Sequence, residues 1–151
     1  MKQRERLLFS WMLPIFYLIH LLEEFYAGIG LPAWLSNVFN AELSNQDFIL
    51  INVFGLAIMI LNALLTSFGK GKDLMLIALT TLLFMNGFIH LIASGLTWSY
   101  NPGVVSGTLV YIPLGFIFFK KKKAFSKENL IAGIFTGIVV HLGVTLTAMN
   151  I

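Results

Sequence analysis

Five apolar runs, each long enough to cross the hydrocarbon layer of a membrane, dominate this 151-residue sequence. A bilayer core is about 30 Å thick, so a spanning helix needs about 20 mainly apolar residues. Unpaired backbone groups are costly in lipid, which makes helices the expected form of such runs. We therefore expect an all-α, polytopic integral membrane bundle, a single domain over residues 1–151 with five transmembrane helices at residues 7–29, 47–68, 73–98, 103–119 and 129–150.

The basic residues predict how these spans are oriented. All ten Lys and Arg residues lie before the first span, between the second and third, or between the fourth and fifth. With five spans these three places share one side, and the positive-inside rule makes that side cytoplasmic. We expect a multi-pass protein of the cell membrane with a cytoplasmic N-terminus and an extracytoplasmic C-terminus. The net charge of +3 arises from these flanking residues, so no nucleic-acid partner is expected.

The first span carries ionisable residues where lipid disfavours them. His20, Glu23 and Glu24 lie within about one helical turn, and a charge near a bilayer centre costs roughly 2.5 to more than 10 kcal/mol. Helical bundles use carboxylate and imidazole groups at such spacing to bind divalent metals. The alternative is a helix end whose carboxylates reach the membrane surface while His20 hydrogen-bonds to a neighbouring helix.

Two further histidines lie at a similar expected depth. Counting about 1.5 Å per residue from the cytoplasmic edge, His20 and His141 lie about 21 Å up and His90 about 26 Å up. Asn86 lies one turn below His90 on the same helix face. It either fixes the tautomer of a histidine, as groups around metal ligands do, or bridges two helices. These depths predict one site in the outer half of the membrane, although each of the two later histidines taken alone is equally typical of an interhelical hydrogen bond.

Three local patterns have structural interpretations. Residues 31–39 are expected to form either a short interfacial helix or an ordinary outer loop. Pro113 is expected to kink its helix, because proline lacks the N–H that a helix needs. Gly133 and Gly137 have the spacing of closely packed membrane helices, which indicates either internal packing or the contact face of a homo-oligomer.

The chain also resembles a known family. His20-Leu21-Leu22-Glu23-Glu24 resembles the signature of the HXXEE family of small integral membrane proteins, and Asn86-Gly87-Phe88-Ile89-His90 is similar to its second element. The turn Tyr100-Asn101-Pro102-Gly103 resembles a later segment of that family. The resemblance implies the catalytic role suggested for that family's residues, here at His20, Glu23, Glu24, Asn86 and His90. The expectation that His141 belongs to the same site rests on the depth estimate alone.

These residues favour an intramembrane, metal-dependent enzyme of the hydrolase type that acts on a lipid or lipid-linked substrate. The expected ligands of a divalent metal are His20, Glu23, His90 and His141, and zinc, iron and manganese all accept such a set. The sequence has no cysteine, which excludes thiolate ligands. Glu24 is expected to act as general base or second ligand, and the expected catalytic residues are Glu23, Glu24 and Asn86.

Three alternatives use the same residues differently. A metal-free enzyme would use them as acid and base to isomerise an apolar substrate. A small proton-coupled transporter or binding protein would use them as a proton relay, although the polar residues gather in one half of the membrane. An accessory membrane subunit would explain the short loops but not the matched depth of the histidines.

Overall fold

The computed structural model describes residues 1–150, and helices account for nearly all of them. Each long helix coincides with one apolar run of the sequence, to within a few residues at either end. In chain order the elements are α1 (Gln3–Tyr26), α2 (Leu31–Phe39), α3 (Asn45–Ser67), α4 (Asp73–Thr97), α5 (Val104–Ser106), the π-helical turn η1 (Gly107–Tyr111), α6 (Ile112–Phe119), the 3-10 turn η2 (Lys122–Ala124) and α7 (Lys127–Asn150).

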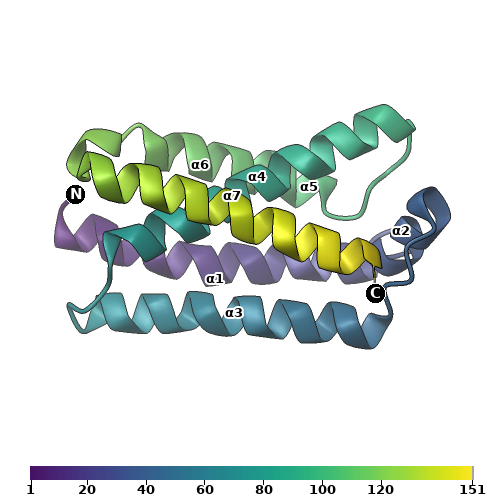
Figure 1. Cartoon of the computed structure of the whole chain (residues 1–151), viewed down its shortest axis with the longest axis horizontal. Helices are drawn as coiled ribbons and strands as arrows, with labels where there is room; N and C mark the ends of the chain where they lie inside the picture. Colours follow the sequence, from purple (N-terminus) through teal and green to yellow (C-terminus); the bar gives the residue numbers. More distant parts are fainter. Residues whose placement is uncertain (151) are drawn as a thin grey trace.

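Successive long elements run in opposite directions, so the two ends of the chain lie at opposite ends of the bundle (Figure 1). Among the described residues, α1, α3, α4 and α7 are long and apolar enough to cross a membrane. The fifth expected span is a shorter apolar helix over residues 104–119, which extends only about 24 Å at 1.5 Å per residue. An all-α bundle with helices typical of a membrane protein is thereby confirmed, with four helices long and apolar enough to span a membrane and a fifth that is shorter.

The short helix is irregular where it meets its neighbours. It begins as α5, continues through the π-helical turn η1, and returns to regular geometry in α6, where Pro113 occupies the first turn. A π-helical turn of this kind accommodates an interruption of the regular hydrogen-bond ladder, and such turns are frequent at functional sites. The backbone approaches α4 closely here, because a Cβ added at Gly87 would lie 2.7 Å from the carbonyl oxygen of Gly107.

The remaining helices pack in two pairs, α3 along α1 and α7 along α4. The glycine pair of α7 faces α4, since a Cβ at Gly133 would lie 2.7 Å from Ile77 and one at Gly137 would lie 2.5 Å from the carbonyl oxygen of Ala78. Of the two interpretations of this glycine spacing, the structure therefore supports internal packing. Small residues let two helix backbones approach closely. Because no hydrophobic force drives helices together in lipid, such close packing is a main source of their association.

The two ends of the bundle differ in character. The N-terminus and the α3–α4 and α6–α7 connections share one end (Figure 1), where Arg6 pairs with Asp73 and Lys121 Nζ lies 2.7 Å from Glu5. We name this the basic end. At the opposite end, the segment 31–39 forms the helix α2, and its Trp34 donates a hydrogen bond of 3.1 Å to the Ser99 hydroxyl.

Candidate metal site and its cavity

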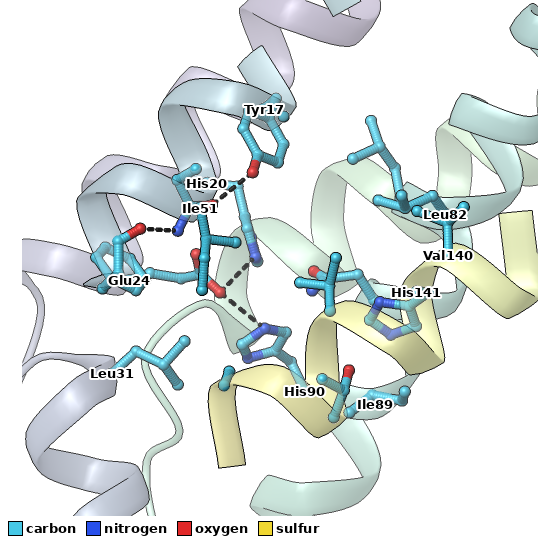
Figure 2. A pocket seen from close by; sticks show the side chains of 18 of the residues that line it. Tyr17, His20, Glu24, Leu31, Ile51, Leu82, Ile89, His90, Val140 and His141 are labelled. Carbon is cyan, nitrogen blue, oxygen red and sulfur yellow. Dashed lines mark hydrogen bonds and ion pairs between the residues drawn. The ribbon is translucent and has the colours of Figure 1, made fainter. Parts of the chain in front are cut away.

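Three buried side chains from two helices converge at the end of the bundle opposite the basic end. His20 and Glu24 lie one turn apart on α1, and His90 reaches them from α4 (Figure 2). Glu24 Oε1 lies 3.3 Å from His20 Nε2 and 3.1 Å from His90 Nε2. Each of the three residues is at most 5% exposed. We call His20, Glu24 and His90 the central triad.

The other nitrogen of each imidazole is held by a partner outside the triad. His20 Nδ1 lies 2.7 Å from the Ser106 hydroxyl, and His90 Nδ1 lies 2.9 Å from Asn101 Oδ1. The Ser106 hydroxyl donates its proton to Glu23, so toward His20 it can only accept. This network assigns the Nδ1–H tautomer to both rings, because Asn101 Oδ1 is also an acceptor. In the neutral rings, both Nε2 lone pairs then point at the Glu24 carboxylate.

Glu23 points away from the triad and supports it from outside. Its carboxylate accepts hydrogen bonds from the backbone N–H groups of Val105 (2.9 Å) and Ser106 (2.7 Å), at the start of the short helix. Exposed backbone N–H groups and the helix dipole make such a helix start favourable for a negative charge. Tyr100 donates a further hydrogen bond of 2.8 Å to Glu23. Burial and the adjacent Glu23 carboxylate raise the pKa of Tyr100 to about 12, which keeps that hydroxyl protonated.

The turn between α4 and α5 presses against both imidazoles. Gly103 has a φ of +100°, and an added Cβ would lie 2.7 Å from His90 Cε1 and 2.8 Å from His20 Cε1. Glycine is required here both for its backbone conformation and for space. The sequence identified residues 101–103 only as a tight turn, although their likeness to a family segment was a signal of a further role. The contributions of Asn101 and Gly103 to holding the histidines were missed.

The triad forms part of the wall of a cavity of about 770 Å³. Apolar side chains of α2, α3, α4 and α7 make up most of the lining, for example Leu31, Ile51, Leu82 and Val140 (Figure 2). The volume lies within the range of about 300–1,000 Å³ that is typical of small-molecule sites. A large apolar cavity with a few convergent polar groups is the usual form of a binding site.

The sequence-predicted residues occupy three places. The structure brings His20, Glu24 and His90 together, while Glu23 lies behind them. His141 and Asn86 line the cavity outside the triad, and neither His141 Nε2 nor Asn86 Oδ1 has a hydrogen-bond partner among the described residues. Asn86 therefore does not fix a histidine tautomer through this oxygen; the amide that does so for His90 is Asn101.

The triad is suited to holding a cation. His20, Glu24 and His90 each offer one ligand atom, and these three atoms all lie within 4.8 Å of one another. Two imidazole nitrogens and one carboxylate oxygen are a ligand set used by catalytic zinc, which leaves a fourth position for water. Hydrogen bonds from the far ring nitrogens to fixed acceptors are the usual support of metal-bound histidines. The same geometry also suits proton sharing between the carboxylate and the imidazoles.

Comparison with known proteins yields one relationship. No curated protein and no solved structure matches the chain. The family described as proteins of unknown function with an HXXEE motif matches residues 11–118. That range includes all three residues of the triad, the turn that packs against them and nearly all of the short helix. Because the match covers more than half of the sequence, this chain belongs to the HXXEE family.

Proposed function

We propose that the protein is an intramembrane, metal-dependent enzyme that hydrolyses a lipid or lipid-linked substrate. The observation that carries the proposal is the convergence of three acceptor atoms, two Nε2 and one carboxylate oxygen, in a buried site. Without a cation or added protons, these lone pairs would face one another with water excluded, which is costly. A single divalent ion bound by His20, Glu24 and His90 would satisfy all three.

The chemistry follows from the ligand set and its surroundings. When bound, a divalent metal would lower the pKa of a water ligand to about 7 and so would supply a nucleophile at neutral pH. The chain's own residues orient the ligands: Ser106 and Glu23 hold His20, and Asn101 holds His90. The apolar cavity would hold the substrate's chain and exclude water from the reacting bond. Zinc, iron and manganese all suit nitrogen and carboxylate ligands.

The proposal includes an orientation in the cell membrane. The positive-inside rule assigns the basic end to the cytoplasm, which puts the N-terminus inside, the C-terminus outside and the triad in the outer half of the membrane. Residues of both α3 and α7 line the cavity, and these helices belong to different packed pairs. A lipid would enter between them from the outer leaflet.

A second candidate function is metal-free proton transfer, as in an isomerase. It is favoured by the unbroken series of polar contacts that runs from Glu23 through Ser106, His20 and Glu24 to His90. Such a series can move a proton between the cavity and the outer surface. In this case the triad would carry protons where the first proposal has a metal.

Metal analysis distinguishes the two candidates. Detergent-purified protein, as isolated and after incubation with zinc, manganese or ferrous iron, would be analysed by elemental mass spectrometry. We expect about one metal ion per wild-type chain and background levels in a His20→Ala, His90→Ala variant. His141→Ala is the matched control, because it removes a cavity histidine outside the triad and should retain the metal. Wild-type protein that binds none of the three metals would contradict the proposal.

Activity gives an independent test of hydrolysis. Metal-loaded protein in lipid nanodiscs should release a labelled acyl chain from a lipid substrate, and a chelator should stop the release until metal is restored. A Glu24→Gln variant should be inactive at every metal concentration at which the wild type is saturated. Release that continues unchanged after complete removal of the metal would favour the metal-free alternative.

A further inference from the structure

The cavity contains two polar groups that the metal proposal does not use. His141 is 5% exposed, and its Nε2 has no hydrogen-bond partner among the described residues. Asn86 Oδ1 is likewise buried without a partner. Both residues line the cavity, and Figure 2 shows His141 on α7 beside the space that His90 also faces. Buried polar atoms are nearly always hydrogen-bonded, so this pair points to a ligand that supplies the missing partner.

The position of the pair suggests which part of a ligand it meets. Asn86 lies one turn before His90 on α4, on the same face, and α7 packs along α4. The two groups therefore line the same cavity as the triad, and Asn86 lies one turn nearer the basic end than His90. A polar group of the ligand that lies beside the triad would be within their reach, while an attached chain would lie against α3 and α7.

The charges at this end of the bundle limit what that polar group can be. The described residues that line the cavity include no Lys or Arg, and all ten Lys and Arg residues lie near the start of α1, in the α3–α4 and α6–α7 connections, or at the first residue of α7. The carboxylates at the end of the bundle that holds the cavity are Glu23, Glu24, Glu42 and Asp47. Sites that act on phosphoryl groups generally supply basic residues or several metal ions against the developing charge. Nothing here offsets a phosphate or a free carboxylate beyond what one metal ion would provide.

We infer that the cavity binds an uncharged single-chain lipid whose polar group donates a hydrogen bond, such as a monoacylglycerol, and that His141 and Asn86 recognise this group. One hydroxyl of the ligand donates to Asn86 Oδ1 and a second hydroxyl donates to His141 Nε2, and its acyl chain fills the apolar part of the cavity. The inference rests on the proposed function only for the ester bond that would be cleaved, because recognition itself requires no metal.

Photolabelling measures recognition without turnover. A monoacylglycerol with a diazirine in its acyl chain would be cross-linked to metal-free wild-type protein in detergent, and the labelled residues mapped by mass spectrometry. Competitors with the same oleoyl chain would be 1-monooleoylglycerol, oleate and 1-oleoyl lysophosphatidate. We expect labels on cavity residues of α3 and α7, and competition by monooleoylglycerol at a concentration about tenfold lower than for either anion.

Variants test the two recognition residues. His141→Leu and Asn86→Leu should each weaken labelling about three- to tenfold, the usual effect of one lost hydrogen bond, whereas His141→Gln keeps an acceptor and should retain most of it. Phe135→Leu, on the exposed face of α7, is the matched control and should label as the wild type does.

The two proposals fail differently in these experiments. Equal or stronger competition by lysophosphatidate, or labels that fall outside the cavity, would overturn the inference even if the protein binds a metal. Unchanged labelling of both leucine variants would also overturn it. Selective, variant-sensitive labelling of a protein that never binds metal would support the inference and contradict the hydrolase.

Discussion

The two ends of the helical bundle differ in how closely their side chains pack and in which groups they bury. Toward the basic end the helices bury a close-packed apolar core: the rings of Phe9 (α1) and Phe118 (α6) meet edge to face with their centroids 5.2 Å apart, and Leu13 and Phe118 are fully buried. At the opposite end the same helices surround a cavity of about 770 Å³ and bury two imidazoles with a carboxylate. Buried ionisable groups and voids both reduce stability, so the packed end must compensate for the site.

This contrast indicates that stability and function are separated along the bundle axis. Natural proteins break the rules of good packing mainly at functional sites and compensate elsewhere. Changes at the basic end should therefore alter unfolding while leaving metal binding intact, and changes at the triad should do the reverse. The following predictions test this separation.

The largest effect is expected from loss of the central carboxylate. Glu24→Gln keeps the size of the side chain but removes the charge that two imidazoles share, so metal content should fall to background while the melting temperature in detergent stays equal or rises. Elemental analysis and thermal unfolding measure the two quantities. Glu23→Gln is the adjacent control and should retain measurable metal. Equal loss in both variants would mean that the triad is not the ligand set.

The packed end should show the complementary result. Phe118→Ala leaves a cavity in the core. In the wild-type protein, however, unfolding within a membrane moves the Phe118 ring into lipid and not into water, so burial of the ring contributes less to stability. We expect a loss of about 2 kcal/mol in unfolding free energy, below the value for soluble proteins, with unchanged metal content. Leu109→Ala, on an exposed face of the same short helix, should change stability little. A Phe118→Ala variant that folds normally but loses its metal would break the separation.

Removal of an outer support should weaken the site without abolishing it. Ser106→Ala deletes the hydroxyl that joins Glu23 to His20, while Glu23 keeps its bonds to backbone N–H groups. Loss of such a support typically costs 10- to 100-fold in metal affinity, and we expect a value near tenfold. Competition with a chromogenic chelator would measure it. Ser99→Ala serves as the control, and an unchanged affinity in Ser106→Ala would show that the tautomer is set in another way.

The smallest effect is expected from the ion pair at the basic end. Arg6→Gln removes the partner of Asp73, and ion pairs of this kind contribute about 0–1 kcal/mol. Stability and metal content should both stay near the wild-type values. Lys121→Gln, which breaks the contact with Glu5, is a parallel control. A loss of several kcal/mol in either variant would show that charge, rather than aromatic packing, stabilises this end.

Much of the fold could be predicted because it depends on local composition. The apolar runs and their polar interruptions predicted the long helices to within a few residues at each end, and residues 31–39 formed the short helix that was one of two expectations. The fifth helix was predicted to within one residue at its start, but it is shorter than the other four and below the length of a full span. The run over 103–119 is apolar throughout, and the turn at Gly103, which packs against both histidines, directly precedes the helix start at Val104.

The site could be predicted only in outline. The i,i+4 spacing of His20 and Glu24 was sufficient to put them on one face of a helix, and the estimated depth brought His90 near them. Neither property distinguishes Glu24 from Glu23, because both are compatible with a groove that contains His20. Asn101 was recognisable only as part of a turn, since its role depends on where that turn folds back onto α4.

By itself, the sequence determined that this chain forms apolar helices, which of their ends carry the basic residues, and that His20, Glu24 and His90 lie at a similar depth. These properties follow from residue order along single helices. The tertiary structure alone decided that Glu24 faces His90 while Glu23 caps the short helix. Successive residues of a helix point about 100° apart, so the rotation of α1 against α4 and the π-helical segment selects which carboxylate enters the cavity.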